Sequence, residues 1–424
     1  MFFLYFLVFS MPFFRHPVIN AGGGILSVPK MAGLLGMLYV FAHVRQQGFP
    51  NYFGPRLSKL FLAIFTWAMI SFLVQGRAPR IDVGDPSLLY ISEFIFLILM
   101  ITLIDTPKKV EWVFFVALAS VAFASLYILR EYQVYRSLGP NYRPDAKILG
   151  DANYFSMAAM LGFPIGFFWF LVESRPAYRR FLIAVLLLAG AGIAVSGSRG
   201  GLLALMVFML FAAWRTRKMG QLVLLLLLIF PPMLCIPKNP IIRMLHPDFA
   251  DKQGALARIV TWKAGMRMSF EHPITGIGLA QFRPKLADYT GVANMSKLAH
   301  NTYLEFAAEL GIPCLVLYCW LLLETWRALA RIRRAASKMN DRLLLNLATG
   351  MQGGLLGYLV SSFFLSSEYV RFFWFYVFVT IVLERLVQKW IVAQIDDSAP
   401  PIDSLVLPQR IPVIPGGWAA KGAE

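Results

Sequence analysis

The sequence predicts an all-α, polytopic membrane protein with about twelve transmembrane helices and one large loop that contains short helices. Of the 424 residues, 58% are hydrophobic and only 15% are charged, whereas a soluble domain carries about 25% charged residues. Apolar runs of about 15 to 20 residues recur along the whole chain, and helices of that length cross a hydrocarbon core of about 30 Å. These observations exclude a soluble domain with one buried helix.

The predicted spans follow one another with mostly short connections. We expect the first span to be retained, because Met1–Phe14 has neither a basic segment before its apolar run nor a small-residue cleavage site after it. Only Gly197 and Ser198 separate the seventh span from the eighth. The predicted spans are 2–20, 26–44, 57–74, 87–104, 112–129, 152–172, 181–196, 199–214, 221–236, 301–326, 343–366 and 371–388.

Basic connections predict the orientation of the chain. Positive charges cluster after the second, sixth, eighth and tenth spans, and short loops of this kind remain on the cytoplasmic side. Both termini are therefore expected in the cytoplasm, with 395–424 as a disordered tail that is rich in proline and poor in aromatic residues. The clusters comprise Arg45, Arg56, Arg175, Arg179, Arg180, Arg215, Arg217, Lys218, Arg327, Arg331, Arg333, Arg334, Lys338 and Arg342.

Two substantial loops, 130–150 and 237–299, are then expected on the opposite side of the membrane. The formal net charge of the chain is +17, but its cations are spread between apolar spans, so we predict membrane lipids rather than nucleic acid as partners. The basic residues of the longer loop either touch lipid headgroups or form an electropositive cup for an anionic ligand. They are Lys238, Arg243, Lys252, Arg258, Lys263, Arg267, Arg283, Lys285 and Lys297, against Asp248, Asp251, Glu271 and Asp288.

Within this loop, the periodicity of apolar residues predicts a helix over 255–270 that lies on the membrane or packs over the spans. Arg258 falls at the edge of its apolar arc, one turn before Trp262. The following segment, 272–278, contains one proline and two glycines and is expected to turn. The arc consists of Leu256, Ile259, Trp262, Met266 and Phe270.

The mouth of the tenth span carries residues suited to acid–base chemistry. His300 lies at the water boundary, where an imidazole could act as a general base, or could simply cap the helix beside Asn301. Tyr303 shares a helical face with His300. Glu305 and Glu309, one turn apart, are membrane-embedded carboxylates, which usually face a polar cavity or a cation, and they could orient the imidazole or an arginine.

Three further polar residues lie on the same predicted side. Arg199 stands between the seventh and eighth spans, where it could hold an anion or merely extend its guanidinium towards the headgroups. Asp151 and Asn153 precede the sixth span and are expected to be cap residues.

The sequence contains none of the common nucleotide or metal motifs. It has no Walker lysine loop, no H-E-x-x-H pair and no outer D-x-D, so we predict neither a metal nor a cofactor. Cys235, Cys314 and Cys319 lie in apolar segments without a C-x-x-C partner, and no disulfide is expected. A bound diphosphate would have to be neutralised by arginines.

Three motifs in this order resemble the O-antigen ligases and the related Wzy-type polymerases. They are Ser198-Arg-Gly-Gly201, the stretch from His272 to Gly278 with Phe282, and His300-Asn-Thr-Tyr-Leu-Glu305 continuing to Pro313. The resemblance covers a core of 181–370, which contains the loop 237–299. Segment 1–180 holds the preceding spans, 371–394 the last span and 395–424 the tail.

The resemblance implies a bacterial inner-membrane glycosyltransferase of lipopolysaccharide biosynthesis, with a periplasmic active site. Its donor would be an O-antigen glycan on undecaprenyl diphosphate, and its acceptor a sugar hydroxyl of lipid A–core. His300 matches the family's histidine at the end of the large loop, Arg199 its Ser-Arg-Gly arginine, and Arg258 looks like its loop arginine. We expect His300 to deprotonate or orient the acceptor, the two arginines to bind the diphosphate without metal, and Asn301, Tyr303, Glu305 and Glu309 to support them.

Other functions use similar residues. A Wzy-type polymerase would pass the glycan to another repeat unit on the same carrier, and a protein O-oligosaccharyltransferase would pass it to Ser or Thr. A transporter of lipid-linked sugar predicts charges at the membrane midplane and two related halves. The sequence has no internal repeat, and its distinctive polar residues collect at one face.

Overall fold

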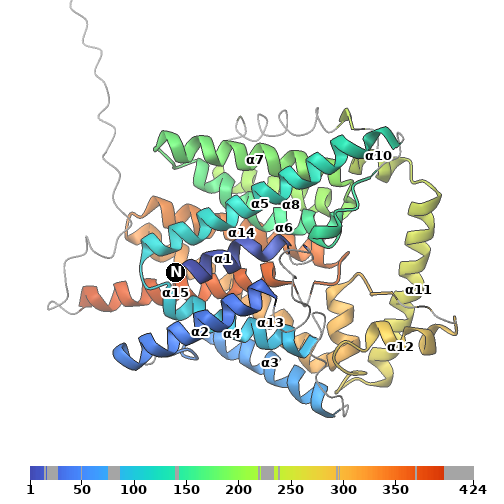
Figure 1. Ribbon diagram of the computed structural model, residues 1–424, viewed down its shortest axis with the longest axis horizontal. Helices are drawn as coiled ribbons and strands as arrows, with labels where there is room; N and C mark the ends of the chain where they lie inside the picture. The colour runs from blue at the N-terminus through green and yellow to red at the C-terminus, as the bar shows by residue number, and fades with distance from the viewer. Residues whose placement is uncertain are drawn as a thin grey trace, which may run out of the picture.

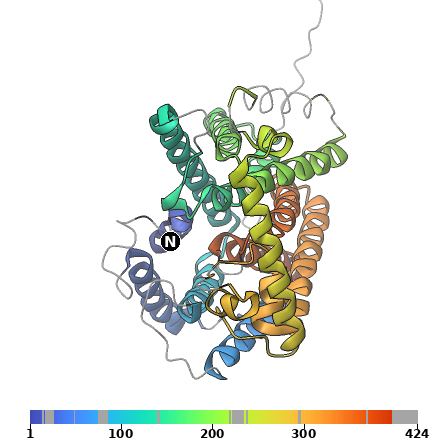
Figure 2. The same cartoon turned by 90° about the vertical axis from the view of Figure 1, so that its right-hand side faces the viewer.

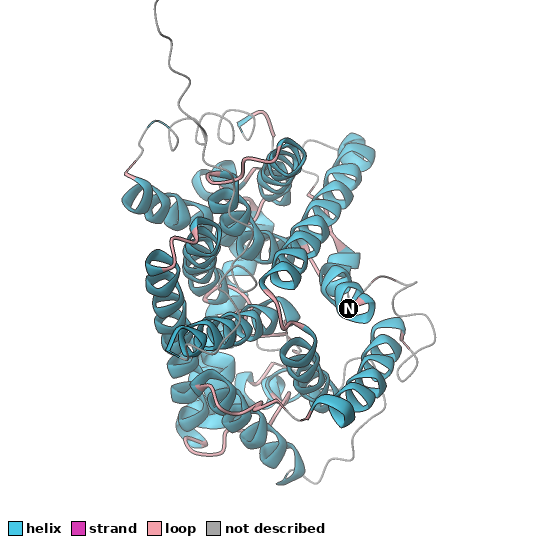
Figure 3. Ribbon diagram, turned by 90° about the vertical axis from the view of Figure 1, so that its left-hand side faces the viewer, coloured by secondary structure: helices cyan, strands magenta, loops and turns pink. Residues whose placement is uncertain are grey.

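Helices are the regular secondary structure of the described part of the chain. The computed structural model describes residues 1–13, 16, 27–48, 50–74, 86–138, 143–217, 220, 234–236, 239–292, 295, 297–367 and 370–395. Within these ranges there are helices, turns and loops but no strand (Figure 3), which confirms the predicted all-α class. Most of the predicted span 221–236 and nearly all of the predicted tail 395–424 lie outside the described residues.

Long helices form a bundle, and three helices of the large loop lie at one end of it (Figure 1). These three are α10 (Pro240–Leu245), α11 (Phe249–Glu271) and α12 (Phe282–Thr290). Figure 2 views this end, with α11 running across it. The bundle comprises α1 (Phe2–Ser10), α2 (Val28–Gln47), α3 (Arg56–Val74), α4 (Pro86–Leu103), α5 (Pro107–Tyr135), α6 (Ala152–Phe170), α7 (Pro176–Ser196), α8 (Arg199–Thr216), α13 (Thr302–Lys338), α14 (Arg342–Ser362) and α15 (Arg371–Ile395).

The polytopic membrane character is confirmed, whereas the number of twelve spans is not. Among the described residues, six helices are long and apolar enough to cross a membrane, namely α3, α5, α7, α8, α13 and α14. Three shorter apolar stretches accompany them, Phe2–Phe13, Val28–Ala42 and Leu88–Leu103. In the predicted first span 2–20, α1 ends at Ser10 and is followed by a 3-10 turn, Met11–Phe13, and most of the remainder lies outside the described residues.

The predicted connection after span ten is helical. Helix α13 continues to Lys338, well beyond the predicted end of this span at 326. Arg331 in this extension donates hydrogen bonds to Glu324 at 2.7 Å and to Glu384 of α15 at 2.6 Å. These two carboxylates anchor the end of α13. Its basic residues had suggested an exposed loop.

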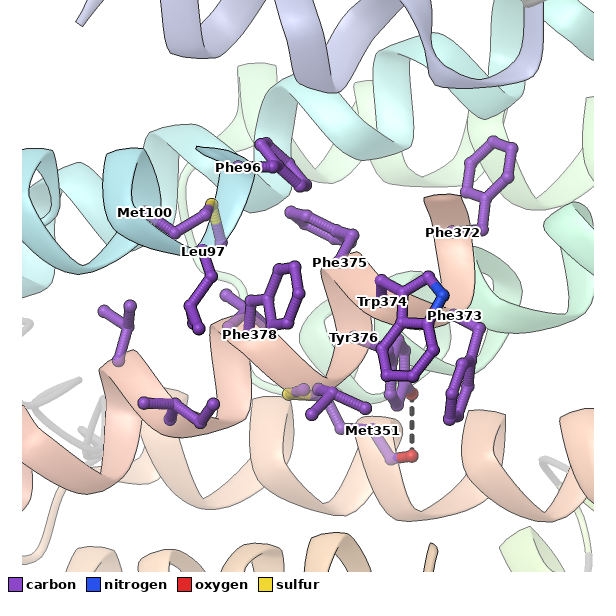
Figure 4. Close-up of a cluster of buried hydrophobic side chains, with 14 of the residues drawn as sticks. Phe96, Leu97, Met100, Met351, Phe372, Phe373, Trp374, Phe375, Tyr376 and Phe378 are labelled. Atoms are coloured by element: carbon purple, nitrogen blue, oxygen red, sulfur yellow. Dashed lines mark hydrogen bonds between the residues drawn. The ribbon is translucent and has the colours of Figure 1, made fainter. Parts of the chain in front are cut away.

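Small residues let the central helices approach closely, as is common in membrane bundles. Gly350 of α14 lies against the backbone of Pro164 and Ile165 in α6, where an added Cβ would be only 2.8 Å from Pro164 O. Beside this contact, aromatic residues of α15 pack against α4 and α14 (Figure 4). The Tyr376 hydroxyl donates a hydrogen bond of 2.6 Å to Met351 O. This core holds the bundle that carries the loop helices.

Candidate active site

The turn between α7 and α8 positions Arg199. Gly197 ends α7 in the left-handed conformation, with φ +62°, and the Ser198 hydroxyl caps α8 by accepting a hydrogen bond of 3.2 Å from Gly201 N. A Cβ at Gly201 would be 2.7 Å from Ser156 Cβ. The Ser-Arg-Gly-Gly motif thus makes a tight turn against α6 and puts Arg199 at the first position of α8.

Helices α10 and α11 are tied to this turn by ionic contacts. Arg243 of α10 donates a short hydrogen bond to Gly197 O and another to Asp251 of α11. The Asp251 carboxylate also lies 3.6 Å from Arg199 Nη2. Asp251 therefore bridges Arg243 of α10 and Arg199 of α8, and it holds the start of α11 over the bundle.

A further arginine enters from the connection between α5 and α6. Arg143 donates hydrogen bonds to Ser196 O at 2.7 Å and to the Asn153 side chain at 2.9 Å. Asp151 caps α6, accepting from Asn153 N and Tyr154 N at 2.6 and 3.0 Å. The cap prediction is thus confirmed for Asp151, whereas the Asn153 side chain holds Arg143.

These contacts gather Arg143, Arg199 and Arg243, and Arg258 of α11 is close enough to interact electrostatically with Arg199, Arg243 and Asp151. We name these four residues the arginine cluster. Burial, followed by the charges of Arg243 and Arg199, lowers the pKa of Arg143 to about 10, while Asp151 and Asp251 oppose this effect. Burial and the charge of Arg199 also lower the pKa of Arg258. The four guanidinium groups lie near two carboxylates, those of Asp151 and Asp251. The partly buried cluster therefore keeps an excess of two positive charges. Such a cluster favours an anion.

His300 lies beside this cluster. Its backbone adopts a left-handed conformation with φ +50°, and its N–H donates a hydrogen bond of 3.0 Å to the Ser366 hydroxyl. Burial, the charge of Arg258 and that of Lys297 lower the imidazole pKa, against the opposing effect of Asp151. The Nδ1 atom is buried and accepts no hydrogen bond from any described residue. His300 therefore favours its neutral form, which a general base requires.

The candidate supporting residues have mainly structural contacts. Asn301 caps α13 by accepting a hydrogen bond of 3.0 Å from Leu304 N, as predicted. The Tyr303 hydroxyl donates to Leu359 O at 3.2 Å and accepts from Ser362 at 3.1 Å, which joins α13 to α14. Glu305 is buried in α13, with 1% of its surface exposed.

Glu309, which the sequence offered as a partner for the imidazole or an arginine, holds the backbone of a neighbouring turn. Both of its carboxylate oxygens accept hydrogen bonds from backbone N–H groups, those of Ala280 at 2.8 Å and Phe282 at 2.9 Å. Glu309 thus caps the start of α12. The sequence suggested a polar cavity or a cation, because a carboxylate within the membrane needs polar partners to offset the cost of its burial. Here the backbone N–H groups of a neighbouring turn are such partners.

The 272–278 segment makes the predicted turn and crosses α13 at a break in that helix. Ile277 N and Gly278 N donate to Ala308 O and Glu309 O at 2.8 and 2.9 Å, and Ile312 N donates to Pro273 O at 2.8 Å. Gly311 leaves helical geometry with φ +81°. The two segments approach so closely that a Cβ at Gly276 would lie 2.3 Å from the Glu309 backbone.

We expect Gly276→Ala and Gly311→Ala to destabilise the protein by about 3 kcal/mol each, because each adds a methyl group against backbone at a positive φ. Thermal unfolding of the purified variants in detergent measures the effect. Gly254→Ala in α11 is the control, since no neighbouring segment lies within 4 Å of the position that its methyl group would take, and φ there is not positive. Equal stability of all three variants would contradict the close crossing.

Helix α11 packs against its neighbours mainly through the face opposite its predicted apolar arc. Its apolar arc is largely exposed, including Leu256 at 63% and Phe270 at 84%. The buried face is formed by small residues and Met268: Gly265 lies against Leu304 and Phe282, where a Cβ would be only 2.9 Å away from each. Of this arc, Trp262 packs against the bundle, with its ring centroid 5.6 Å from that of Phe363, and the closest approach of α11 is on the opposite side, at Gly265.

The structure brings together Arg199, Arg258 and His300, as the sequence predicted. Trp262 of α11 donates a hydrogen bond of 2.8 Å to Ala299 O and so holds this helix next to His300. Sequence reasoning did not single out Arg143, and it named Arg243 only as one of nine basic residues in loop 237–299. Among the described residues, no group of three His, Cys, Asp or Glu side chains is arranged to hold a metal ion.

Comparison with known proteins identifies the part of the chain that carries this site. Residues 183–319 match the family model described as O-antigen ligase. A search of curated proteins finds no match. The matched range extends from α7 to the middle of α13 and includes all the loop helices. Residues 183–319, which contain Arg199, Arg258 and His300, therefore form a domain of the O-antigen ligase family.

Proposed function

We propose that this protein is a glycosyltransferase of the bacterial inner membrane that transfers an O-antigen glycan from undecaprenyl diphosphate to a sugar hydroxyl of lipid A–core, on the periplasmic face. The observation that carries the proposal is the arginine cluster beside a neutral His300, inside a domain of the O-antigen ligase family. Basic residues at the other end of the bundle, such as Arg333 and Arg334 of α13, support the assignment of that end to the cytoplasm.

The arginine cluster suits a lipid diphosphate. Its excess of two positive charges over Asp151 and Asp251 complements the charge of a diphosphate diester. Guanidinium groups bind phosphate oxygens through two parallel hydrogen bonds. As the bond between the anomeric carbon and the diphosphate breaks, negative charge grows on the leaving oxygen, and cations held in advance stabilise that charge.

His300 would act on the acceptor. A sugar hydroxyl attacks the anomeric carbon from the face opposite the diphosphate and forms a new glycosidic bond. The bond to the diphosphate breaks, undecaprenyl diphosphate leaves with its electron pair, and the hydroxyl proton passes to a ring nitrogen of His300. Attack from the opposite face inverts the configuration at the anomeric carbon.

The pH dependence of kcat/KM for glycan transfer should reflect the environment of the His300 imidazole. Burial and Arg258 lower the pKa of the imidazole below its ordinary value of 6.5, so His300 stays neutral and able to accept a proton down to a pH below 6.5. We expect the acidic limb of kcat/KM to lie below pH 6.5. Lys297→Gln removes a charge that lowers this pKa and should move the limb to higher pH. A limb at or above pH 7 would contradict the role of His300.

Transfer by the purified protein should not depend on a divalent metal, because arginines neutralise the diphosphate. We expect full activity with EDTA, measured as glycosidic product from an undecaprenyl-diphosphate-linked glycan and purified lipid A–core. Loss of activity that magnesium or manganese restores would contradict the metal-free mechanism. Parallel reactions with a second donor molecule or a Ser/Thr peptide as acceptor distinguish a polymerase and a protein O-oligosaccharyltransferase from a ligase, and no product with any acceptor would favour a transporter.

A further inference from the structure

A second candidate ligand site lies at the end of the bundle away from His300. An open cavity of about 300 Å³ is lined there by α2, α4 and α15 and by the connections that follow α2 and α4. Helix α15 starts close to the active site, since Ser366, five residues earlier, accepts a hydrogen bond from His300. Arg385 is about 21 Å along this helix from Arg371, and Figure 1 shows α15 reaching the side away from α11 and α12.

Two cations one helical turn apart line this cavity, Arg385 and Lys389. Arg385 is half-buried, its Nη1 atom is buried without a hydrogen-bond partner, and its guanidinium group forms no ion pair with a described residue. The adjacent Glu384 is engaged with Arg331 instead, at 2.6 Å. Asp105 at the rim pairs with Lys109 at 2.7 Å. The cavity therefore holds positive charge that the described carboxylates leave uncompensated.

Other arginines at this end of the bundle, unlike Arg385, form ion pairs with carboxylates. Arg175 forms ion pairs with Glu111 and Glu173, and Arg331 with Glu324 and Glu384. A half-buried guanidinium group is costly to leave without an anion. Arg385 is thus a side chain for which a ligand would supply the missing partner.

The walls of the cavity indicate the kind of anion. Val44, Ile101 and Val382 are buried apolar residues of three different helices, and each contributes to the lining. Apolar side chains thus form part of the lining beside the two cations, and this combination matches a phosphate group that carries a hydrocarbon chain.

We propose that the cavity between α2, α4 and α15 binds the phosphate of an anionic membrane phospholipid through Arg385 and Lys389, with Val44, Ile101 and Val382 against its hydrocarbon portion. The site is separate from the arginine cluster and does not rest on the proposed transferase activity. A lipid bound here would join α2 and α4 to α15 and stabilise this end of the bundle.

The test titrates the full-length protein in neutral detergent with phosphatidylglycerol, with phosphatidylcholine or with inorganic phosphate, and follows the unfolding temperature. We expect a saturable rise with phosphatidylglycerol and little change with phosphatidylcholine. Arg385→Gln/Lys389→Gln should weaken the apparent affinity roughly 30-fold, the product of two cation–phosphate contacts of ordinary strength at a membrane surface. The control is Arg334→Gln/Lys338→Gln, an exposed pair with the same spacing on α13.

Each outcome decides the proposal. Loss of the shift in the Arg385/Lys389 variant alone supports the site. An equal loss in the Arg334/Lys338 control, or no loss in either variant, overturns it, because general surface charge would then explain the binding. Stabilisation by inorganic phosphate as strong as that by phosphatidylglycerol would overturn the lipid assignment and identify a soluble phosphate as the ligand. Transferase activity does not enter these measurements, so their failure leaves the proposed function untouched.

Discussion

Replacement of His300 by alanine or asparagine is expected to lower the rate of glycan transfer by about 10²–10⁴-fold, the usual contribution of a general base. The asparagine variant tests the imidazole more directly, because asparagine tolerates the left-handed conformation that residue 300 adopts, with φ +50°. The His300→Asn protein should therefore fold normally and still bind the donor. The measurement is product formation from a lipid-diphosphate donor at saturating and limiting acceptor concentrations.

The two variants separate chemistry from backbone strain. If only the alanine variant lost activity while the asparagine variant kept it, residue 300 would be needed for its conformation, not for its imidazole. If both variants kept normal transfer at normal expression, the assignment of the site to His300 would be wrong. Unfolding temperatures of both variants show whether lost activity reflects lost folding.

Removal of a guanidinium group from the arginine cluster should have the second large effect. We expect Arg258→Gln and Arg199→Gln each to lower kcat/KM by about 10²–10³-fold, the usual cost of one group that stabilises charge in the transition state. Lysine at either position should restore only part of the activity, because an ammonium group cannot bind two phosphate oxygens in the planar geometry of guanidinium.

Arg267 provides a control on the same helix as Arg258. It lies nine residues further along α11, has 62% of its side chain exposed and pairs with Glu271 at 2.7 Å. Arg267→Gln should leave kcat/KM within about twofold of the wild type, since exposed ion pairs contribute little. Equal losses for Arg258→Gln and Arg267→Gln would instead indicate a general effect of positive charge on α11, and would refute a specific diphosphate site.

Much of the helical architecture could be predicted because it depends on local patterns. Gly197 and Ser198 separate α7 from α8 where expected, since a left-handed glycine and a serine cap are local signals. The helix predicted over 255–270 is present as α11, Phe249–Glu271. The end of α13 could not be predicted from local patterns, because Arg331 in its continuation to Lys338 has a partner in Glu384, which lies far away in the sequence.

The sequence by itself determined the helical class, the membrane character and three residues that the fold gathers, Arg199, Arg258 and His300. These follow from hydropathy, spacing and short motifs, which act over a few turns of chain. Only the tertiary structure decided that Arg143 and Arg243 join the cluster, and that Glu309 caps α12. A charged side chain finds its partner by position in space, and contacts between distant segments, such as Arg143 with Ser196, leave no periodic signal along the chain.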